Sequence, residues 1–582
     1  MKKNVFSHAF LGLASLICLS SLSGCSSADD SLTLRLLNCE DYIGEDPFIY
    51  QDQDDETETE FASVLEGFQE LESARLGKKV KIVYDTYDTN ETMLSSLKTG
   101  KTSYDLIVAS DYTIQKMMTL GMLQALDFAK VPNYTQYASP YLIRQLDGIS
   151  AEIDGVPCSL GDYSVGYMWG TLGILYNPAK VASDKGMDED EVKLAMNEWG
   201  SLWEDRFYGE MSVKDSMRDT YSVGIMKEFE QDILSAMEES GCFDENLDLI
   251  EGKWDEAVKT YSPKLAEIFN RCNEENVEKV KNCLLALKKN IFGFEVDSGK
   301  EDIVKGMIGM NLAWSGDAVY SIETAEEPEF NPQYLYYSIP KTGGNIWFDG
   351  WMMTKDCQGE RKDLAYDFLN YLSDPQIASA NMDFIGYTPF IAGPAIHELV
   401  YTWYDPRSEE YYGEEGTPWT ESDYLGATID GTTYTWEEIA EEYEWSVVDL
   451  TYMFKGTLDV EEEFLGDTPS SNPYLFYTDE LEEISVGEEH CIAGRGFMAQ
   501  YPSEEIIPKL AIMKDYGENN KYVLAMWQDV KANNLPLAGV IVFGIILVTL
   551  SAFIIASMVA KRRFRAIRVA RSKTALKRSQ KK

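Results

Sequence analysis

Short apolar runs alternate with helical patterns along the first part of the chain, and this alternation constrains the fold more than any other feature. After each run, apolar residues recur at helical spacing, beginning near Phe61, Met93 and Ile114. Strands that alternate with helices form an α/β sheet, so we expect an α/β fold. The predicted strands are Leu32–Leu37, Val80–Tyr84 and Leu106–Val108.

The chain is too long for one hydrophobic core. About 500 residues lie between its two apolar ends, whereas single cores stop growing at roughly 250–300 residues. We therefore expect at least two lobes. The stretch from Leu399 to about Val486 is dense in Glu, Tyr and Trp and is interpreted as an acidic insertion. Its aromatic residues form either the core of a small subdomain or a partner surface.

The N-terminus has the pattern of a lipoprotein signal peptide. Lys2 and Lys3 precede an apolar stretch, Ala9–Leu19, and the segment ends in Leu-Ser-Gly-Cys at Cys25. This is the pattern of a bacterial lipobox, so residues 1–25 are predicted to be a signal peptide and Cys25 the lipidated residue. An ordinary signal peptide with an incidental cysteine is the alternative.

The C-terminus predicts a membrane-spanning helix. Leu537–Ala560 contains 24 residues and no charged side chain, and about 20 apolar residues suffice to cross a bilayer. The tail 561–582 carries eleven Lys and Arg residues and no acid. The positive-inside rule therefore predicts a cytoplasmic tail and places the remainder outside the cell or in the periplasm. A buried soluble helix is the alternative.

The charge and the cysteine pattern exclude several classes of protein. The formal net charge of the chain is -47, which repels nucleic acid and attracts cations. The cysteines form no CxxC pair, and neither His397 nor His490 has a recognisable catalytic setting. The chain also lacks a GxxxxGK[ST] phosphate-binding loop. We therefore expect no metal site, no cofactor and no enzymatic activity.

Acids and aromatic residues follow the strands of the predicted sheet. Ligands of open α/β sheets bind beyond the carboxyl ends of the strands. Carboxylates there accept hydrogen bonds from ammonium groups, and aromatic faces cover methylenes and attract cations. Ca²⁺ also uses carboxylates but needs no tryptophan, so the pattern favours an organic polycation. Each acid alone is more simply a solvated strand end or a helix cap. The residues are Asn38, Asp41, Tyr42, Ser110, Tyr112, Asp215, Asp219, Trp314, Asp317, Trp347 and Asp349.

Several of these residues lie in segments that resemble the bacterial spermidine/putrescine-binding proteins. The segments fall in the order of that family across about 350 residues, from residue 31 to residue 392, with a short C-terminal part. They are Asn38–Tyr42 (NCEDY), Tyr87–Met93 (YDTNETM), Tyr104–Tyr112 (YDLIVASDY), Tyr163–Thr171 (YSVGYMWGT), Asp215–Asp219 (DSMRD), Trp314–Ala318 (WSGDA), Pro340–Asp349 (PKTGGNIWFD) and Ile385–Pro389 (IGYTP).

The resemblance implies a two-lobed, periplasmic-binding-protein-like (type II) fold with a hinge and a central cleft. Such a receptor closes over one polyamine and delivers it to an ABC permease, while a separate subunit hydrolyses ATP. The first lobe would comprise residues 31–150 and 347–392, and the second lobe residues 151–346 and 393–532, with the insertion at about 399–486. A membrane-anchored sensor or adhesion protein is the alternative function. A hydrolase that uses paired carboxylates is a third.

The resemblance also assigns roles to the strand-end residues. Tyr42, Ser110 and Tyr112 would line the first lobe, with Asp41 adding charge. Asp215 or Asp219 would hold an amine from the second lobe. Trp314 and Trp347 would enclose the methylene chain, Asp349 would pair with an amine, and Tyr387 would close one wall.

Two positions depart from the pattern of that family. Cys39 stands where an aromatic residue is usual. A polar contact near the C-terminus falls at Met513 or Lys514, and a lysine there would oppose a cation.

Overall fold

The computed structural model describes residues 31–52, 57–100, 102–326, 333–408, 426–429, 432–461, 465–479, 481–486, 489–493 and 495–532. The predicted signal peptide with Cys25, the predicted helix 537–560 and the tail 561–582 lie outside these ranges. Among the residues described, no helix combines the length and the apolar character needed to cross a membrane.

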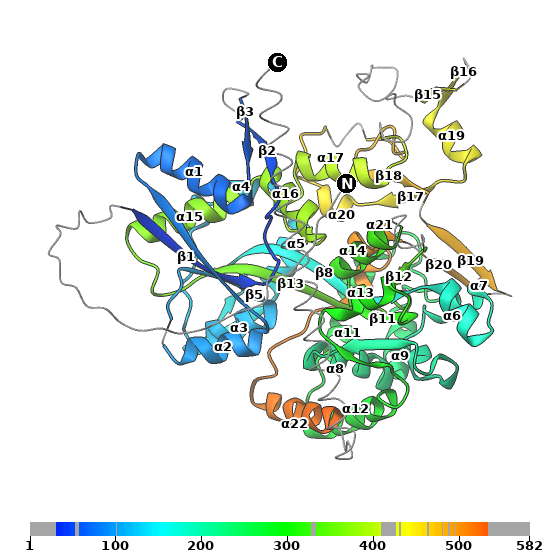
Figure 1. The fold of residues 1–582 in the computed structure, drawn as a ribbon. Coiled ribbons are helices and arrows are strands. Elements are labelled where there is room, and N and C mark those ends of the chain that lie inside the picture. Colours follow the sequence, from blue (N-terminus) through cyan, green and yellow to red (C-terminus); the bar gives the residue numbers. More distant parts are fainter. Residues whose placement is uncertain are drawn as a thin grey trace, which may run out of the picture.

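One long mixed sheet runs through the molecule (Figure 1). Its main path orders the strands β10-β9-β11-β8-β13-β5-β1-β4, and β12, β14 and β21 pair beside this path. The three predicted strands are confirmed as β1, β4 and β5. The bounds are β1 (Leu32–Cys39), β4 (Val80–Tyr87), β5 (Leu106–Ser110), β8 (Ser164–Tyr176), β9 (Met211–Lys214), β10 (Gly293–Glu295), β11 (Met310–Trp314), β12 (Tyr336–Ser338), β13 (Gly344–Met353), β14 (Thr388–Pro389) and β21 (Leu510–Ala511).

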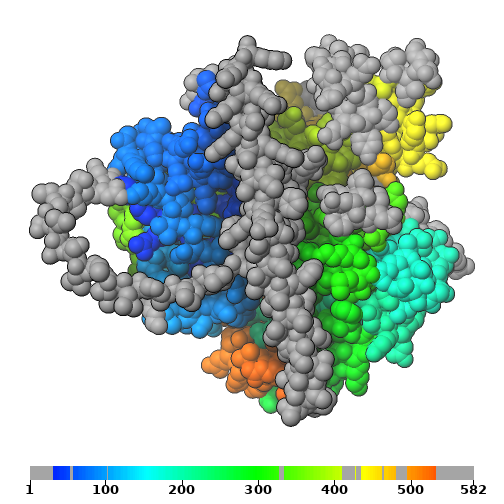
Figure 2. All heavy atoms as spheres, in the orientation of Figure 1, coloured from blue at the N-terminus to red at the C-terminus, as the bar shows by residue number. Residues whose placement is uncertain are grey.

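Helices cover this sheet in two groups, and each group has its own hydrophobic core. Figure 2 shows the blue first lobe and the green second lobe on opposite sides of the molecule. The two-lobed α/β fold is thus confirmed. The first core takes in α1 (Val64–Leu76), α3 (Asp111–Thr119), α5 (Pro140–Gly148), α15 (Glu360–Leu372) and α16 (Pro375–Ile385). The second takes in α7 (Glu189–Ala195), α8 (Met217–Glu228), α9 (Glu230–Ser240), α11 (Ser262–Phe269), α12 (Glu274–Leu287) and α22 (Asn520–Lys531).

The two longest strands of the sheet connect the lobes. β8 pairs with β13 from Ser164 to Thr171 and with β11 from Leu172 to Tyr176. β13 is antiparallel to both of its main neighbours, β8 and β5, and its register shifts between Asp349 and Gly350. A bulge of this kind redirects side chains and is frequent beside functional sites. It lies at the junction of the lobes.

Much of the segment expected to be an acidic insertion packs into the first core. Val400, Tyr452, Phe454 and Phe476 are buried in that cluster. A small separate cluster forms around Trp436. Tyr452, Phe454 and Phe476 therefore form core, whereas Tyr434 and Tyr443 of the same segment are exposed. The lobe boundaries stay a prediction, because the first cluster also contains residues of the region assigned to the second lobe. The elements are α17 (Pro394–Tyr404), α19 (Trp436–Glu442), β17 (Ser446–Asp449), α20 (Thr451–Phe454), β18 (Leu475–Thr478) and α21 (Gly496–Gln500).

Candidate binding site

Strand ends from both lobes meet where β13 passes between them. Asp349 of β13 lies opposite Ser110, the last residue of β5. Tyr42 is the third residue after the end of β1, and Trp314 is the last residue of β11. The main chain thus places predicted site residues from distant parts of the sequence at one junction, as expected for an open α/β sheet.

Three aromatic rings form a connected cluster with Asp349. The hydroxyl of Tyr42 donates a hydrogen bond of 2.9 Å to Oδ2 of Asp349. The ring of Tyr42 contacts that of Tyr387 edge to face, with centroids 5.6 Å apart. Tyr387 in turn packs against Trp347 at 5.5 Å, and its hydroxyl donates to Oδ1 of Asp317 at 3.2 Å. The structure therefore joins Tyr42, Trp347, Asp349 and Tyr387 in one continuous cluster.

Two nearby glycines make room for these rings. A methyl group at Gly170 of β8 would lie 2.6 Å from the ring of Trp347 and 2.5 Å from Oγ of Ser315. A methyl group at Gly316 would overlap the ring of Tyr387. Both contacts are too close for a real side chain, so glycine at these positions lets the rings approach the main chain of β8 and α14 (Ser315–Glu326).

Asp349 is a buried acid with unused hydrogen-bonding capacity. It is 8% exposed, and within the described part of the chain neither its Oδ1 nor Nε1 of Trp347 has a hydrogen-bond partner. Burial raises the pKa of Asp349 to about 6. The hydroxyls of Ser110 and Tyr42 oppose this shift, and the nearby carboxylate of Asp219 adds to it. A buried carboxylate of this kind is costly unless a cation pairs with it.

Asp219 is the second acid at this junction. Burial raises its pKa, while Ser216, Lys214 and the side chain of Trp314 act in the opposite direction. It lies in the first turn of α8, where Ser216 caps the helix by accepting a hydrogen bond from the Asp219 backbone N–H. Because the carboxylate of Asp219 raises the pKa of Asp349, the two acids together favour a bound cation.

Asp215 and Asp41 lie apart from this cluster. The carboxylate of Asp215 forms an ion pair with Lys531 of α22. Asp41 is exposed on the turn after β1, with a left-handed backbone φ of 51°. Of the two acids considered for the second lobe, the structure places Asp219 rather than Asp215 near Asp349.

Tyr112 is covered by a cation of the protein itself. Nδ2 of Asn90 donates to Oγ of Ser110 at 3.0 Å and to the Tyr112 hydroxyl at 3.2 Å. The guanidinium of Arg218, from α8 of the second lobe, stacks 3.9 Å from the centroid of the Tyr112 ring. One face of Tyr112 is therefore already occupied.

Trp314 is covered in the same way by Lys214, a residue that the sequence pattern did not reveal. The ammonium of Lys214 lies 4.3 Å from the centroid of the Trp314 ring. Lys214 ends β9, and its neighbours in the strand are buried on both faces. A buried lysine leaves no signature in an apolar run, and only its place at the end of a strand could have drawn attention to it.

The structure also shows the surroundings of the two positions that depart from the family pattern. The side chain of Cys39 is partly buried, and burial followed by the charge of Asp349 raises its pKa to about 12, so it stays a neutral thiol. Met513 is buried in the second core, and the side chain of Lys514 is exposed. The lysine therefore does not oppose a cation. Its backbone carbonyl instead accepts a hydrogen bond of 3.0 Å from Arg218.

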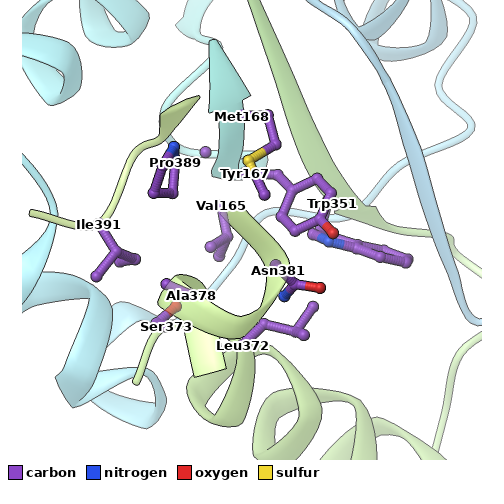
Figure 3. A pocket seen from close by; sticks show the side chains of 11 residues that line it. Val165, Tyr167, Met168, Trp351, Leu372, Ser373, Ala378, Asn381, Pro389 and Ile391 are labelled. Carbon is purple, nitrogen blue, oxygen red and sulfur yellow. The ribbon is translucent and has the colours of Figure 1, made fainter. Parts of the chain in front are cut away.

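A small cavity lies behind the cluster in the first core. Figure 3 shows Tyr167 and Trp351 at one side and Ala378 and Asn381 of α16 at another. Its volume of about 10 Å³ is comparable to one water molecule. It is therefore too small for an organic ligand.

Comparisons with known proteins give consistent matches. The family model described as bacterial extracellular solute-binding protein matches residues 67–404. The spermidine/putrescine-binding periplasmic protein of Escherichia coli is 25% identical over 54% of this chain and 71% of its own length. The putrescine-binding periplasmic protein PotF of Escherichia coli is 27% identical over 53% of this chain and 70% of its own.

A solved structure is also similar. The substrate-binding protein PotD of a spermidine/putrescine ABC transporter from Streptococcus pneumoniae is 23% identical over 63% of this chain and 85% of its own, with a TM-score of 0.42.

Proposed function

Because this chain belongs to the bacterial extracellular solute-binding proteins, which are not enzymes, we propose that it captures a polyamine between its lobes for an ABC importer. The permease and its ATPase would be separate subunits. Relatives whose names specify spermidine or putrescine support this ligand class.

The observation that carries the proposal is the unsatisfied acid in an aromatic setting. Asp349 has a free carboxylate oxygen, and Trp347 and Tyr387 line its surroundings. An ammonium group placed there would gain charge-assisted hydrogen bonds and attraction to the ring faces. The methylenes of a polyamine would cover the same aromatic surfaces. Asp219 from the other lobe would pair with a second ammonium, so that binding favours closure of the lobes.

Calorimetric titration of the purified full chain with putrescine, spermidine, arginine and Ca²⁺ tests this function. We expect one-to-one binding of a polyamine and weak or no binding of arginine and Ca²⁺. Asp349→Asn removes the charge that pairs with the ammonium, and Trp347→Ala removes an aromatic wall, so each change should weaken binding by at least about tenfold.

The matched control is Asp374→Asn. Asp374 is as buried as Asp349, with 8% exposure, but it caps α16 by accepting a hydrogen bond from the backbone N–H of Gln376. This variant should bind the polyamine as the unmodified chain does. A folded chain that binds no polyamine, or equal loss in the control, would contradict the proposed function.

We also propose two membrane attachments for this receptor. Lipidation of Cys25 would anchor its N-terminus, and the apolar segment 537–560 would cross the membrane, with the basic tail 561–582 in the cytoplasm. The lipobox pattern and the eleven basic residues of the tail support this arrangement. Both anchors would hold the binding lobes beside the permease and raise the effective concentration of the two partners.

A further inference from the structure

We propose that Lys214 is a specificity-determining residue whose ammonium fills one amine position of the site, so that the protein selects a diamine over a triamine. This inference rests on the proposed function and concerns the same site.

Lys214 is enclosed by the groups that an amine ligand would use. Its Nζ donates to the backbone carbonyl of Val296 at 3.0 Å and to Oδ2 of Asp317 at 3.0 Å, and it lies 3.3 Å from Oε1 of Glu295. The ring of Trp314 covers the ammonium. Two carboxylates, a carbonyl and an indole face together form a complete binding site for an ammonium group.

This internal ammonium is fixed and charged. The side chain of Lys214 is fully buried, with no exposed surface. Burial alone would lower its pKa, but the carboxylates of Asp317 and Glu295 outweigh that effect and raise it. Lys214 is therefore a cation at neutral pH, and removing it from this position would leave two buried acids without a counter-charge.

The enclosure around Lys214 is continuous with the cluster around Asp349. Asp317, which pairs with Lys214, also accepts the hydrogen bond from the Tyr387 hydroxyl. Tyr387 contacts both Tyr42 and Trp347, which flank Asp349. A ligand held by Asp349 and the three rings would thus have Lys214 at one end, behind Asp317.

The number of unpaired acids at the junction indicates how many ammonium groups the ligand carries. Of the acids gathered there, Lys214 engages Asp317 and Glu295. Burial raises the pKa of Asp111, which lies beside Ser110, to about 8, so this acid is largely neutral at pH 7. Asp219 and Asp349 remain for the ligand. Two available carboxylates match the two ammonium groups of a diamine. The third ammonium of a triamine would either meet the charge of Lys214 or lie without a carboxylate partner, which weakens binding.

The unmodified full chain provides the first test. Calorimetric titration with 1,3-diaminopropane, putrescine, cadaverine and spermidine should give the tightest binding with one of the three diamines. We expect spermidine to bind at least about tenfold more weakly, because its additional charge has no free partner. Spermidine binding as tightly as the best diamine would overturn the inference while leaving the proposed function intact. Absence of binding by every amine would contradict both.

A variant provides the second test. Lys214→Met with Glu295→Gln removes the internal ammonium and one acid, and it leaves Asp317 to receive a ligand amine. The amide introduced by Glu295→Gln is expected to keep an oxygen for the backbone N–H of Gly299, which now donates to Oε2 of Glu295 at 2.9 Å. We expect the ratio of spermidine to putrescine affinity to rise by at least about tenfold.

Lys193→Met is the matched control. Lys193 is also buried, at 6% exposure, and its ammonium lies 4.8 Å from the centroid of the Tyr336 ring, outside the candidate site. This change should leave the ratio of affinities unaltered. An unaltered ratio in the Lys214 variant, or the same shift in the Lys193 variant, would overturn the role of Lys214. If the Lys214 variant does not fold, the diamine and triamine affinities of the unmodified chain decide the question.

Discussion

Asp349, which we propose as a ligand partner, lowers the stability of the free protein because it is a buried acid. Its pKa is raised by burial from an ordinary value of 3.8 to about 6. The folded state therefore holds this proton more tightly than the unfolded state does. Stability from this group falls as the pH rises from about 4 to about 6, and the full cost is present above pH 6. A ligand ammonium would remove that cost.

Asp349→Asn should consequently stabilise the free protein at neutral pH while weakening polyamine binding. A shift of about two pKa units corresponds to roughly 2–3 kcal/mol, and the amide oxygen can still accept the hydrogen bond from Tyr42. Denaturant unfolding of the free chain at pH 4 and pH 8 measures the effect. The gain should appear at pH 8 and be small at pH 4. A variant less stable than the original at pH 8 would contradict the account.

Asp219 and Asp215 should respond differently to the same substitution. Asp219→Asn removes the second acid near Asp349, so we expect putrescine affinity to fall by at least about tenfold. Asp215→Asn should change it by less than about threefold, since the Asp215 carboxylate is engaged by Lys531. Titration of the two variants compares them directly. A larger loss in Asp215→Asn would reverse the assignment.

At the scale of elements, the β13 bulge and the glycines of β8 shape the site. Gly170 allows the ring of Trp347 to lie against β8. Gly170→Ala should displace that ring, weaken putrescine binding by about tenfold or more, and cost about 1–3 kcal/mol in stability through overpacking. Titration and denaturant unfolding measure both effects. Unchanged affinity in a folded Gly170→Ala protein would show that the Trp347 ring is not part of the binding surface.

The strands of the first lobe were predictable from sequence because runs of apolar and β-branched residues indicate buried strands. β1, β4 and β5 begin where expected and extend slightly further. The hairpin of β2 (Phe48–Gln51) and β3 (Glu58–Phe61) was not predicted. The acidic residues there indicate solvation, and its pairing depends on backbone hydrogen bonds that an acidic composition conceals.

The part of the candidate site that was predictable consists of acids and aromatic residues near the ends of strands. Tyr42, Asp349 and Trp347 meet at the junction, and Tyr387, assigned by resemblance, joins them. The contacts of Lys214 could not be anticipated, because its proposed role depends on burial against Asp317 and Glu295, which lie about 100 and 80 residues away along the chain.

At the scale of the whole molecule, two cores are joined by β8, β13 and the C-terminal segment. β21 pairs with β13, and Asp515 forms ion pairs with Lys116 of the first lobe and Arg218 of the second. The chain crosses between the lobes several times, so lobe boundaries cannot be read from a linear sequence. These pairings between the lobes would have to rearrange if the lobes closed over a ligand, as the proposed function requires.

The proposed anchors predict redundant attachment to the membrane. Cys25→Ser should leave the protein in the membrane fraction through the segment 537–560, and deletion of residues 535–582 should leave it there through the lipid. The double variant should be released. Fractionation of cells that express each form measures this. Release by either single change would contradict two independent anchors.

Proton release on binding tests the central claim, that a ligand ammonium pairs with Asp349, most directly. At pH 6 about half of the Asp349 carboxyls carry a proton, which must leave when the ammonium binds. Calorimetry of putrescine binding in buffers of different ionisation enthalpy should therefore report release of about half a proton or more per ligand at pH 6. Tight binding with no proton release at pH 6, or with proton uptake, would contradict the account.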